Sequence, residues 1–213
     1  MIKIRWHGHS CFEISDSVTV VTDPHDGSSI GIKPPNVKAD IVLVTHDHYD
    51  HNKVKVVEKE GTRVIRGGNE TIGGIEVESF KAYHDKEKGA KRGEITMFKF
   101  TVDGITFCHV GDLGHVIDDE TAEKIGHVDI LFIPVGGTFT IDADEAIEVC
   151  KKINPKVVVP MHYKIGGLSL PIERVEPFLE NARKNCEIRH VANEIEIEKD
   201  DLPEETEVWV FTL

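Results

Sequence analysis

The sequence predicts one domain of mixed α and β structure, rich in short strands, over residues 1–213. The length of 213 residues suits one globular domain and does not require two. Apolar residues make up 39% of the chain before its 18 Gly are counted, which supplies a full hydrophobic core and excludes a disordered chain. Short apolar runs recur between Gly, Pro and Asp; they are β-rich over residues 1–104 and alternate with helical periodicity over residues 105–213.

The first half of the chain predicts strands in close succession. Residues 2–6 alternate between apolar and polar side chains, which is the period of a half-buried strand. Residues 11–14 and 18–22 predict two more strands around an Asp-Ser turn, and the Gly- and Pro-rich residues 24–35 predict a loop. Residues 41–44 form a continuous apolar run, typical of a strand buried on both faces. Downstream we expect a short helix over residues 52–59 and strands over residues 63–65, 75–80 and 95–102.

Strands and helices alternate in the second half. Residues 130–134 and 157–159 are apolar runs typical of buried strands. The apolar positions of residues 142–153 have helical spacing, and residues 171–184 predict a helix that begins at a proline. We further expect a helix over residues 120–126 and strands over residues 105–110, 188–191, 195–197 and 208–211.

The charge balance limits the partners of the chain. The 25 Lys and Arg against 38 Asp and Glu give a net charge of −13 at pH 7. Nucleic acid is therefore not expected as a partner, because its backbone normally requires a basic face, whereas a small anionic ligand remains compatible. The first residues lack the apolar stretch of a signal peptide, no apolar run approaches the ~20 residues that cross a bilayer, and the 4 Cys include no CxxC pair. We expect a cytoplasmic protein without a membrane partner.

The strongest chemical signal is a histidine-rich segment directly after the apolar run at residues 41–44. His46, His48, Asp50 and His51 place four ligand-type side chains within six positions. Imidazole suits Zn, Fe or Ni, and a carboxylate adds a hard, charge-neutralising ligand. This density of ligands after a buried strand indicates a metal site rather than a polar surface loop.

Three further candidate ligands follow other apolar runs. His84 comes after the run that starts at residue 75, Asp112 comes after Val110 and Gly111, and His162 follows residues 157–161. Each of these residues alone would be an ordinary loop residue. Together with the histidine-rich segment they form a ligand set from several strand ends.

At these residues the chain resembles the metallo-β-lactamase fold superfamily of binuclear metal hydrolases. Within that superfamily it is similar to the small metal-dependent hydrolase branch related to ascorbate-6-phosphate lactonase. The similarity covers nearly the whole chain and also includes residues 6–12 (WHGHSCF), 22–24 (TDP), 111–112 (GD), 134–140 (PVGGTFT) and 160–163 (PMHY). The resemblance implies an α+β fold, a four-layer αββα sandwich of two mixed β-sheets with the site at one edge, and the two halves of the chain fit this two-sheet plan.

The resemblance also implies a role for each ligand. Two divalent metal ions are implied, most suitably Zn, with Mn or Fe as alternatives. The first ion is expected on His46, His48 and His84, the second on Asp50, His51 and His162, with Asp112 bridging both. Asp23 is expected to order the histidine-rich loop from behind the ligands. A water bridging the ions would have a lowered pKa, and the resulting hydroxide would attack a carbonyl carbon or a phosphorus.

Residues outside this set are candidates for catalysis. Asp50 is expected to carry a proton to the leaving group. His9 either points into the site or packs as a buried histidine bonded to the backbone. His115, three residues after Asp112, is a candidate for substrate contact, and His109 is expected in the core or behind the ligands. At the surface we expect His25, His127 and His190.

Substrate-binding candidates lie in three loops. Lys164, two residues after His162, is a candidate for binding an anion. Gly137 permits close backbone approach, and Thr138 offers a hydroxyl. Residues 85–94 carry four basic side chains and are expected either as a flap that recognises phosphate or carboxylate, or as a solvated loop.

The function favoured by the sequence is hydrolysis of a small soluble ester, lactone or phosphoester. A nuclease acting on RNA or DNA is an alternative that the acidic balance disfavours. A di-iron redox protein is another alternative; such relatives typically carry Glu in place of His48 and a flavin domain that we do not expect here. The last alternative is a protein that binds metal but has no catalytic activity. We expect a small-molecule substrate, and a homo-oligomer stays open because residues 208–213 either complete a sheet or pair with another subunit.

Overall fold

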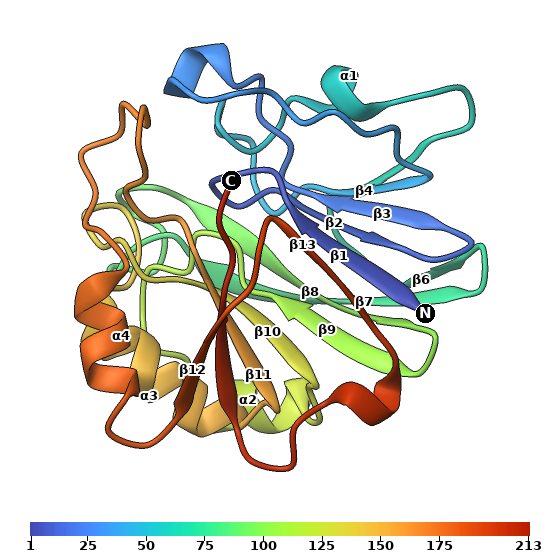
Figure 1. Ribbon diagram of the computed structural model, residues 1–213. Helices are drawn as coiled ribbons and strands as arrows, with labels where there is room; N and C mark the ends of the chain where they lie inside the picture. The colour runs from blue at the N-terminus through green and yellow to red at the C-terminus, as the bar shows by residue number, and fades with distance from the viewer.

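Two β-sheets lie face to face in the computed structural model, which describes all 213 residues (Figure 1). The first sheet has six strands in the order β13-β1-β2-β3-β4-β5, antiparallel from β13 to β3 and parallel from β3 to β5. Its strands are β1 (Ile2–Trp6), β2 (Phe12–Ser15), β3 (Thr19–Thr22), β4 (Ile41–Leu43), β5 (Arg63–Ile65) and β13 (Glu194–Ile197).

The second sheet has eight strands in the order β12-β14-β11-β10-β9-β8-β7-β6. It is antiparallel from β6 to β9 and parallel from β9 to β12, so β7, β9, β10 and β11 all run in one direction. Its strands are β6 (Glu70–Ile72), β7 (Ile75–Tyr83), β8 (Glu94–Val102), β9 (Ile105–His109), β10 (Ile130–Pro134), β11 (Val157–Met161), β12 (Glu187–His190) and β14 (Glu207–Val210).

The two sheets share one hydrophobic core. A single cluster of 47 buried residues includes the inner faces of both sheets. Phe12 of the first sheet meets Phe132 of the second with ring centroids 4.3 Å apart. Phe132 in turn stacks on Phe107 of β9. Such aromatic contacts bury a large apolar area between the sheets.

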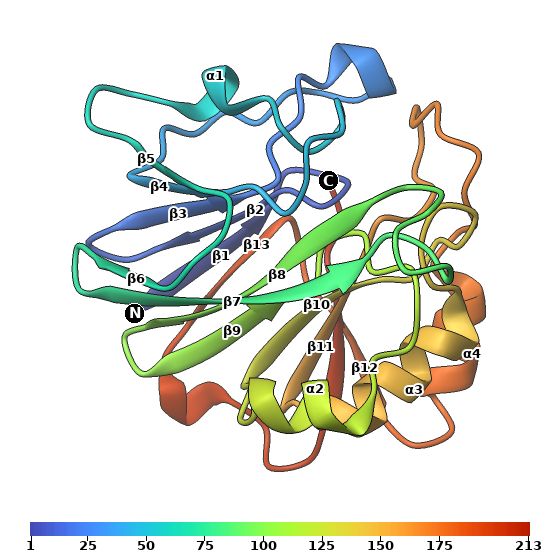
Figure 2. The ribbon, with the colours of Figure 1, turned by 180° about the vertical axis from the view of Figure 1, so that it is seen from behind.

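Helices cover the outer face of each sheet. Figures 1 and 2 show α2 (Asp119–Ile125), α3 (Ala143–Ile153) and α4 (Glu176–Ala182) on the side of the second sheet, opposite α1 (Val54–Val57). The outer layer of the first sheet is thin: a one-turn helix and loops bury Val42 under Val57. Short 3-10 turns are Ser28–Ile30 (η1) and Lys199–Asp201 (η2). The αββα arrangement and the α+β class are confirmed.

Side-chain caps explain where two of the helices begin. The Asp118 carboxylate accepts a hydrogen bond from the backbone of Thr121 at the start of α2. Asp142 and Glu145 form a capping box at the start of α3. None of the helices has the length and apolar character needed to cross a lipid bilayer.

Three expectations about the elements are wrong, and one strand was not expected. The helix expected over residues 171–184 covers only Glu176–Ala182, with Pro177 rather than Pro171 in its first turn. The helix expected over residues 52–59 is limited to one turn. The short polar strand β6 was not anticipated, since it forms only by pairing with β7. The sheets also do not follow the halves of the chain, because β6–β8 join the second sheet and β13 returns to the first.

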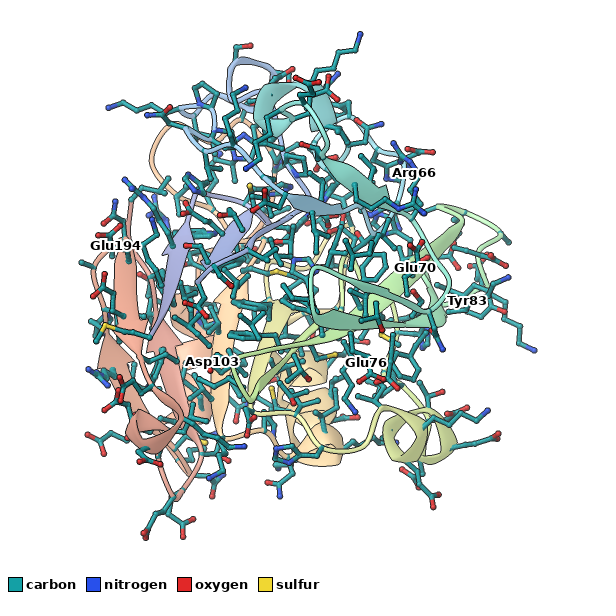
Figure 3. All side chains as sticks on the ribbon, turned by 90° about the vertical axis from the view of Figure 1, so that its right-hand side faces the viewer. Arg66, Glu70, Glu76, Tyr83, Asp103 and Glu194 are labelled. Carbon is teal, nitrogen blue, oxygen red and sulfur yellow. The ribbon has the colours of Figure 1, made fainter.

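The negative charge is spread over the surface. Figure 3 shows Glu76, Asp103 and Glu194 on different parts of the molecule, and all three are exposed. Glu76 lies on β7, Asp103 in the turn between β8 and β9, and Glu194 on β13. These carboxylates lie on both sheets.

Candidate metal centre

The predicted ligands meet at one edge of the sandwich because they follow strands that end there. His46–His51 follow β4, His84 follows β7, Asp112 follows β9, and His162 follows β11. The last three strands run in the same direction, so the loops after them leave the same edge of the second sheet.

The Asp112 carboxylate lies at the centre of four imidazoles. Its Oδ2 is 3.4 Å from Nε2 of His46, 3.0 Å from Nε2 of His51, 3.2 Å from Nε2 of His84 and 3.2 Å from Nε2 of His162. The carboxylate is 2% exposed. Burial opposes its ionisation, but the imidazoles, led by His162, hold the pKa of Asp112 well below its ordinary value.

Two groups of ligand atoms correspond to the expected pair of sites, and a third joins Asp23 to His46 and His51. The ligand atoms of His46, His48 and His84 all lie within 4.8 Å of one another. A second group with the same spacing contains the three residues expected there, and also His9; its members are His9, Asp50, His51 and His162. The structure therefore brings together all seven residues that the sequence analysis selected as ligands.

The chemistry of these groups fits a metal centre. Three buried atoms of the cluster have no hydrogen-bond partner: Nε2 of His46, Nε2 of His51 and Oδ1 of Asp112. The two nitrogens lie within ion-pair distance of the other Asp112 oxygen, Oδ2. Buried polar atoms are ordinarily hydrogen-bonded, so unpaired lone pairs converging on one point suit a cation. Burial lowers the pKa of His51, but the Asp112 and Asp50 carboxylates raise that pKa well above its ordinary value. The cluster thus favours added positive charge.

Asp23 orders the histidine-rich loop from below. Its carboxylate accepts hydrogen bonds from the Thr45 amide at 2.8 Å, the Thr45 hydroxyl at 2.6 Å and Nδ1 of His51 at 3.0 Å. The same hydroxyl is 2.9 Å from Nδ1 of His46. With Nδ1 as the donor, the neutral form of each ring has a lone pair on Nε2 that faces Asp112, and a bound cation would favour that neutral form.

His9 lies in the centre and not in the hydrophobic core. Its Nε2 is 2.8 Å from Oδ2 of Asp50, and its ring is 4.1 Å from the His162 ring. Burial and then the neighbouring His162 lower the pKa of His9 to about 3, so the ring is neutral at ordinary pH. The indole of Trp6 donates to the His9 carbonyl at 3.1 Å, which holds a backbone with φ of 55°. The sequence left this residue undecided between two placements.

Two expected substrate contacts have other partners. Nε2 of His115 accepts from the Tyr83 amide at 3.2 Å and its Nδ1 donates to the Val116 carbonyl at 3.0 Å, so both ring nitrogens are occupied by the backbone. The Lys164 ammonium donates to the carbonyls of Leu168 and Leu170 and therefore fixes its own loop. These bonds occupy the groups from which a substrate contact was expected, and the contacts themselves stay predictions.

Two further histidines lie behind the site, and the expectation for one of them is wrong. His25, expected at the surface, is buried and donates from Nε2 to the His7 carbonyl at 2.8 Å. His109 is buried as expected; its Nε2 donates to the Ser10 carbonyl at 3.0 Å and its Nδ1 accepts from the Gly111 amide at 3.1 Å. The bond from the Gly111 amide to His109 shapes the turn that directly precedes Asp112.

A cavity of about 310 Å³ opens over the metal-binding cluster. Besides ligand side chains, its walls contain two aromatic rings, a leucine and an arginine; these residues are Tyr49, Phe139, Leu170 and Arg92. Next to it lies a hollow of about 350 Å³ that Gly137 and Thr138 help to line, together with Arg92 and Phe139. The Thr138 hydroxyl donates to the Pro171 carbonyl at 3.0 Å. The sequence analysis missed the apolar wall: Tyr49 and Phe139 lie within segments that it singled out, but it assigned no role to either ring, and Leu170 lies in a third loop.

Known proteins share both sequence and fold with this chain. The family described as the Beta-lactamase superfamily domain matches residues 3–162. A UPF0173 metal-dependent hydrolase of Thermoplasma acidophilum is 33% identical over 192 residues, covering 78% of this chain and 85% of that protein. A crystal structure from Thermotoga maritima, of a protein proposed to be a Zn-dependent hydrolase of the metallo-beta-lactamase superfamily, has a TM-score of 0.81 and 37% identity, covering 99% of this chain and 98% of the other.

A more distant solved structure shares the fold alone. Igni18, a metallo hydrolase of the archaeon Ignicoccus hospitalis, is 21% identical, with a TM-score of 0.66, and covers 86% of this chain and 91% of its own. The family match, the relatives and the cluster of histidine and aspartate ligands agree. The chain belongs to the metallo-β-lactamase superfamily, as a metal-dependent hydrolase of the UPF0173 group.

Proposed function

We propose that this protein hydrolyses a small soluble ester, lactone or phosphoester at a centre that holds two divalent metal ions. The observation that carries the proposal is the position of Asp112 between two ligand groups. Its Oδ2 contacts His46 and His84 of one group and His51 and His162 of the other. A carboxylate shared in this way suits two adjacent ions better than one.

Each ion would have its own ligands besides the shared carboxylate. His46, His48 and His84 would hold the first ion. Asp50, His51 and His162 would hold the second. Ligand sets that are rich in imidazole and contain few carboxylates suit Zn best. Fe is an alternative because it also accepts imidazole, and Mn is an alternative because it accepts carboxylates.

The protein residues then prepare the reaction in a defined way. A divalent ion held by these residues would lower the pKa of a coordinated water toward ~7 and would polarise a substrate oxygen. Asp23 and Thr45 keep His46 and His51 in the ring orientation that exposes Nε2. Asp50 lies on the cavity wall and is the carboxylate available to hold a proton and deliver it to the leaving group. His9 donates to Oδ2 of Asp50 and thereby fixes its orientation.

The cavity supports a small substrate. Its volume of about 310 Å³ is at the lower end of the range for small-molecule sites, ~300–1,000 Å³. Tyr49, Phe139 and Leu170 give it apolar walls that would receive the carbon skeleton. The net charge of −13 disfavours a nucleic acid substrate, which would need a basic track for its phosphates.

Metal content per chain, measured by plasma mass spectrometry on protein purified without added metal, tests the proposal. We expect about two ions per chain in the wild type and fewer in His48→Ala. The matched control is His190→Ala, which removes an exposed imidazole that belongs to none of the ligand groups and should leave the content unchanged. Hydrolysis of an aryl ester, a lactone and a bis-aryl phosphate should fall with the metal. The absence of bound metal even after reconstitution would refute the proposal.

A further inference from the structure

Three basic residues line the cavity or the hollow beside it, and of these only Arg92 has no carboxylate partner. Lys86 pairs with Glu145 at 2.9 Å and Lys91 pairs with Glu87 at 2.7 Å. The Lys164 ammonium is occupied by backbone carbonyls. Arg92 lies in the same loop as the first two lysines, yet no carboxylate oxygen lies within 4.0 Å of its guanidinium. Its charge is therefore available to a ligand.

Arg92 also lies where a substrate would reach it. It lines the cavity over the metal-binding cluster and the neighbouring hollow, so its side chain stands at the junction of the two spaces. Its guanidinium lies over the ring of Phe139, 5.5 Å from the ring centroid. A cation–π contact of this kind orients the planar group without using its N–H donors. These donors make no hydrogen bond to another protein group and therefore remain available to a ligand.

The loop that carries Arg92 is a fixed structure and not a loose flap. The Asp85 carboxylate accepts hydrogen bonds from four backbone amides: Glu87 and Gly89 at 2.8 Å, Lys91 at 2.9 Å and Arg92 at 2.7 Å. The loop is also closed by a hydrogen bond from the His84 amide to the Gly93 carbonyl at 3.0 Å. The backbone of Arg92 is thus tied to the residue that follows the ligand His84.

We propose that Arg92 binds a carboxylate or phosphate group of the substrate at the mouth of the metal-binding cavity. A guanidinium presents paired N–H donors that match both oxyanions. On a surface with a net charge of −13, an anionic substrate needs such a local cation to approach. The assignment rests on the proposed function only in that the bond to be hydrolysed lies at the metal centre.

A binding measurement tests Arg92 without any turnover. Butyrate, glutarate and 3-phosphonopropionate are titrated by calorimetry into wild type, Arg92→Ala and Lys91→Ala. Butyrate carries one carboxylate, whereas the other two carry a second anionic group at a similar distance. In the wild type we expect the second group to tighten binding about fivefold. Arg92→Ala should lose this gain while keeping the butyrate affinity. Lys91→Ala should retain it, because Lys91 is already paired.

The relative affinity of the two dianions distinguishes a carboxylate-specific from a phosphate-specific site. No gain from the second anionic group in the wild type, or an equal gain in Arg92→Ala, would overturn the assignment. If the protein held no metal even after reconstitution, the proposed hydrolytic centre would be refuted. A gain in affinity that depends on Arg92 would still support the assignment of Arg92 in that case.

Turnover provides the second readout. The substrates are 4-nitrophenyl esters of butyrate, glutarate and 3-phosphonopropionate. We expect kcat/KM of the wild type to favour the two charged esters, and Arg92→Ala to lose that preference with the neutral ester unchanged within twofold. Equal kcat/KM for charged and neutral esters in the wild type would count against the assignment while leaving metal-dependent hydrolysis intact.

Discussion

Replacement of Asp23 by Asn should weaken metal binding from outside the ligand set. The carboxylate accepts three hydrogen bonds, and one oxygen receives both the Thr45 hydroxyl and Nδ1 of His51. An amide has only one accepting oxygen, so Asp23→Asn must either leave the Thr45 amide unpaired or turn an NH₂ group toward His51. In the second case His51 would need the other tautomer, with its proton on Nε2, where the ion is expected.

The size of the effect follows from these bonds. Loss of one buried hydrogen bond to a charged group costs ~1.5–3 kcal/mol of stability. Loss of a carboxylate that orients a ligand typically weakens metal affinity about 10–100-fold. We therefore expect Asp23→Asn to fold with a lower melting temperature and to lose one ion to a chelator at a concentration that leaves the wild type loaded.

The assay is competition with a chromophoric chelator, followed by metal analysis of the protein. Glu13→Gln is the matched control: Glu13 is also a buried carboxylate, hydrogen-bonded to His7 at 2.9 Å and paired with Lys3 at 2.8 Å, but it contacts no ligand. It should destabilise the fold and leave metal affinity unchanged. If Asp23→Asn held its ions as tightly as the control, the proposed orienting role would be wrong.

Three further predictions follow from the same geometry. Asp112→Asn should bind at most one ion per chain, measured by plasma mass spectrometry, and two retained ions would contradict the shared position of this carboxylate. His9→Ala should lower kcat about a hundredfold with KM little changed, whereas His9→Gln, which can still donate to Asp50, should recover part of the rate; an equal loss in both variants would point to a packing defect. Burial opposes charge on Glu13, but hydrogen bonds from His7 and Lys3 lower its pKa from 4.5 to about 2. Its contribution to stability is therefore present above pH 4.5 and lost as the pH falls toward 2, so the difference in unfolding free energy between wild type and Glu13→Gln should shrink over that interval, and a constant difference would show that the charge of Glu13 does not matter.

The strands and the ligand set were predictable because their signals are local. The apolar run at residues 41–44 corresponds to β4, and the ligands after it are neighbours in the sequence. His84, Asp112 and His162 each directly follow an apolar run, and strands that run in one direction bring their ends to one edge. The short strand β6 had no such signal, since its polar residues form a strand only because β7 offers a free edge.

The helix that ends near residue 182 shows why local signals mislead. Pro171 is a plausible first residue, but its carbonyl accepts the Thr138 hydroxyl and the adjoining loop is held by Lys164. These tertiary bonds keep residues 171–175 out of the helix, which begins at Glu176. Tertiary contacts of this kind commonly override local helix propensity.

The order of residues along the chain was enough to select side chains that meet in one cluster, because metal-binding side chains at strand ends leave a compact pattern. The environment of each side chain depended on contacts between distant segments. Lys164 and Arg92 are both basic residues that follow a predicted ligand in the sequence. The Lys164 ammonium donates to backbone carbonyls, whereas the Arg92 guanidinium lines the cavity without a carboxylate partner. His9 and His25 are both buried, and only His9 reaches a ligand, through Asp50. Hydrogen-bond partners of a side chain are set by which loops pack together, and a sequence pattern does not contain that information.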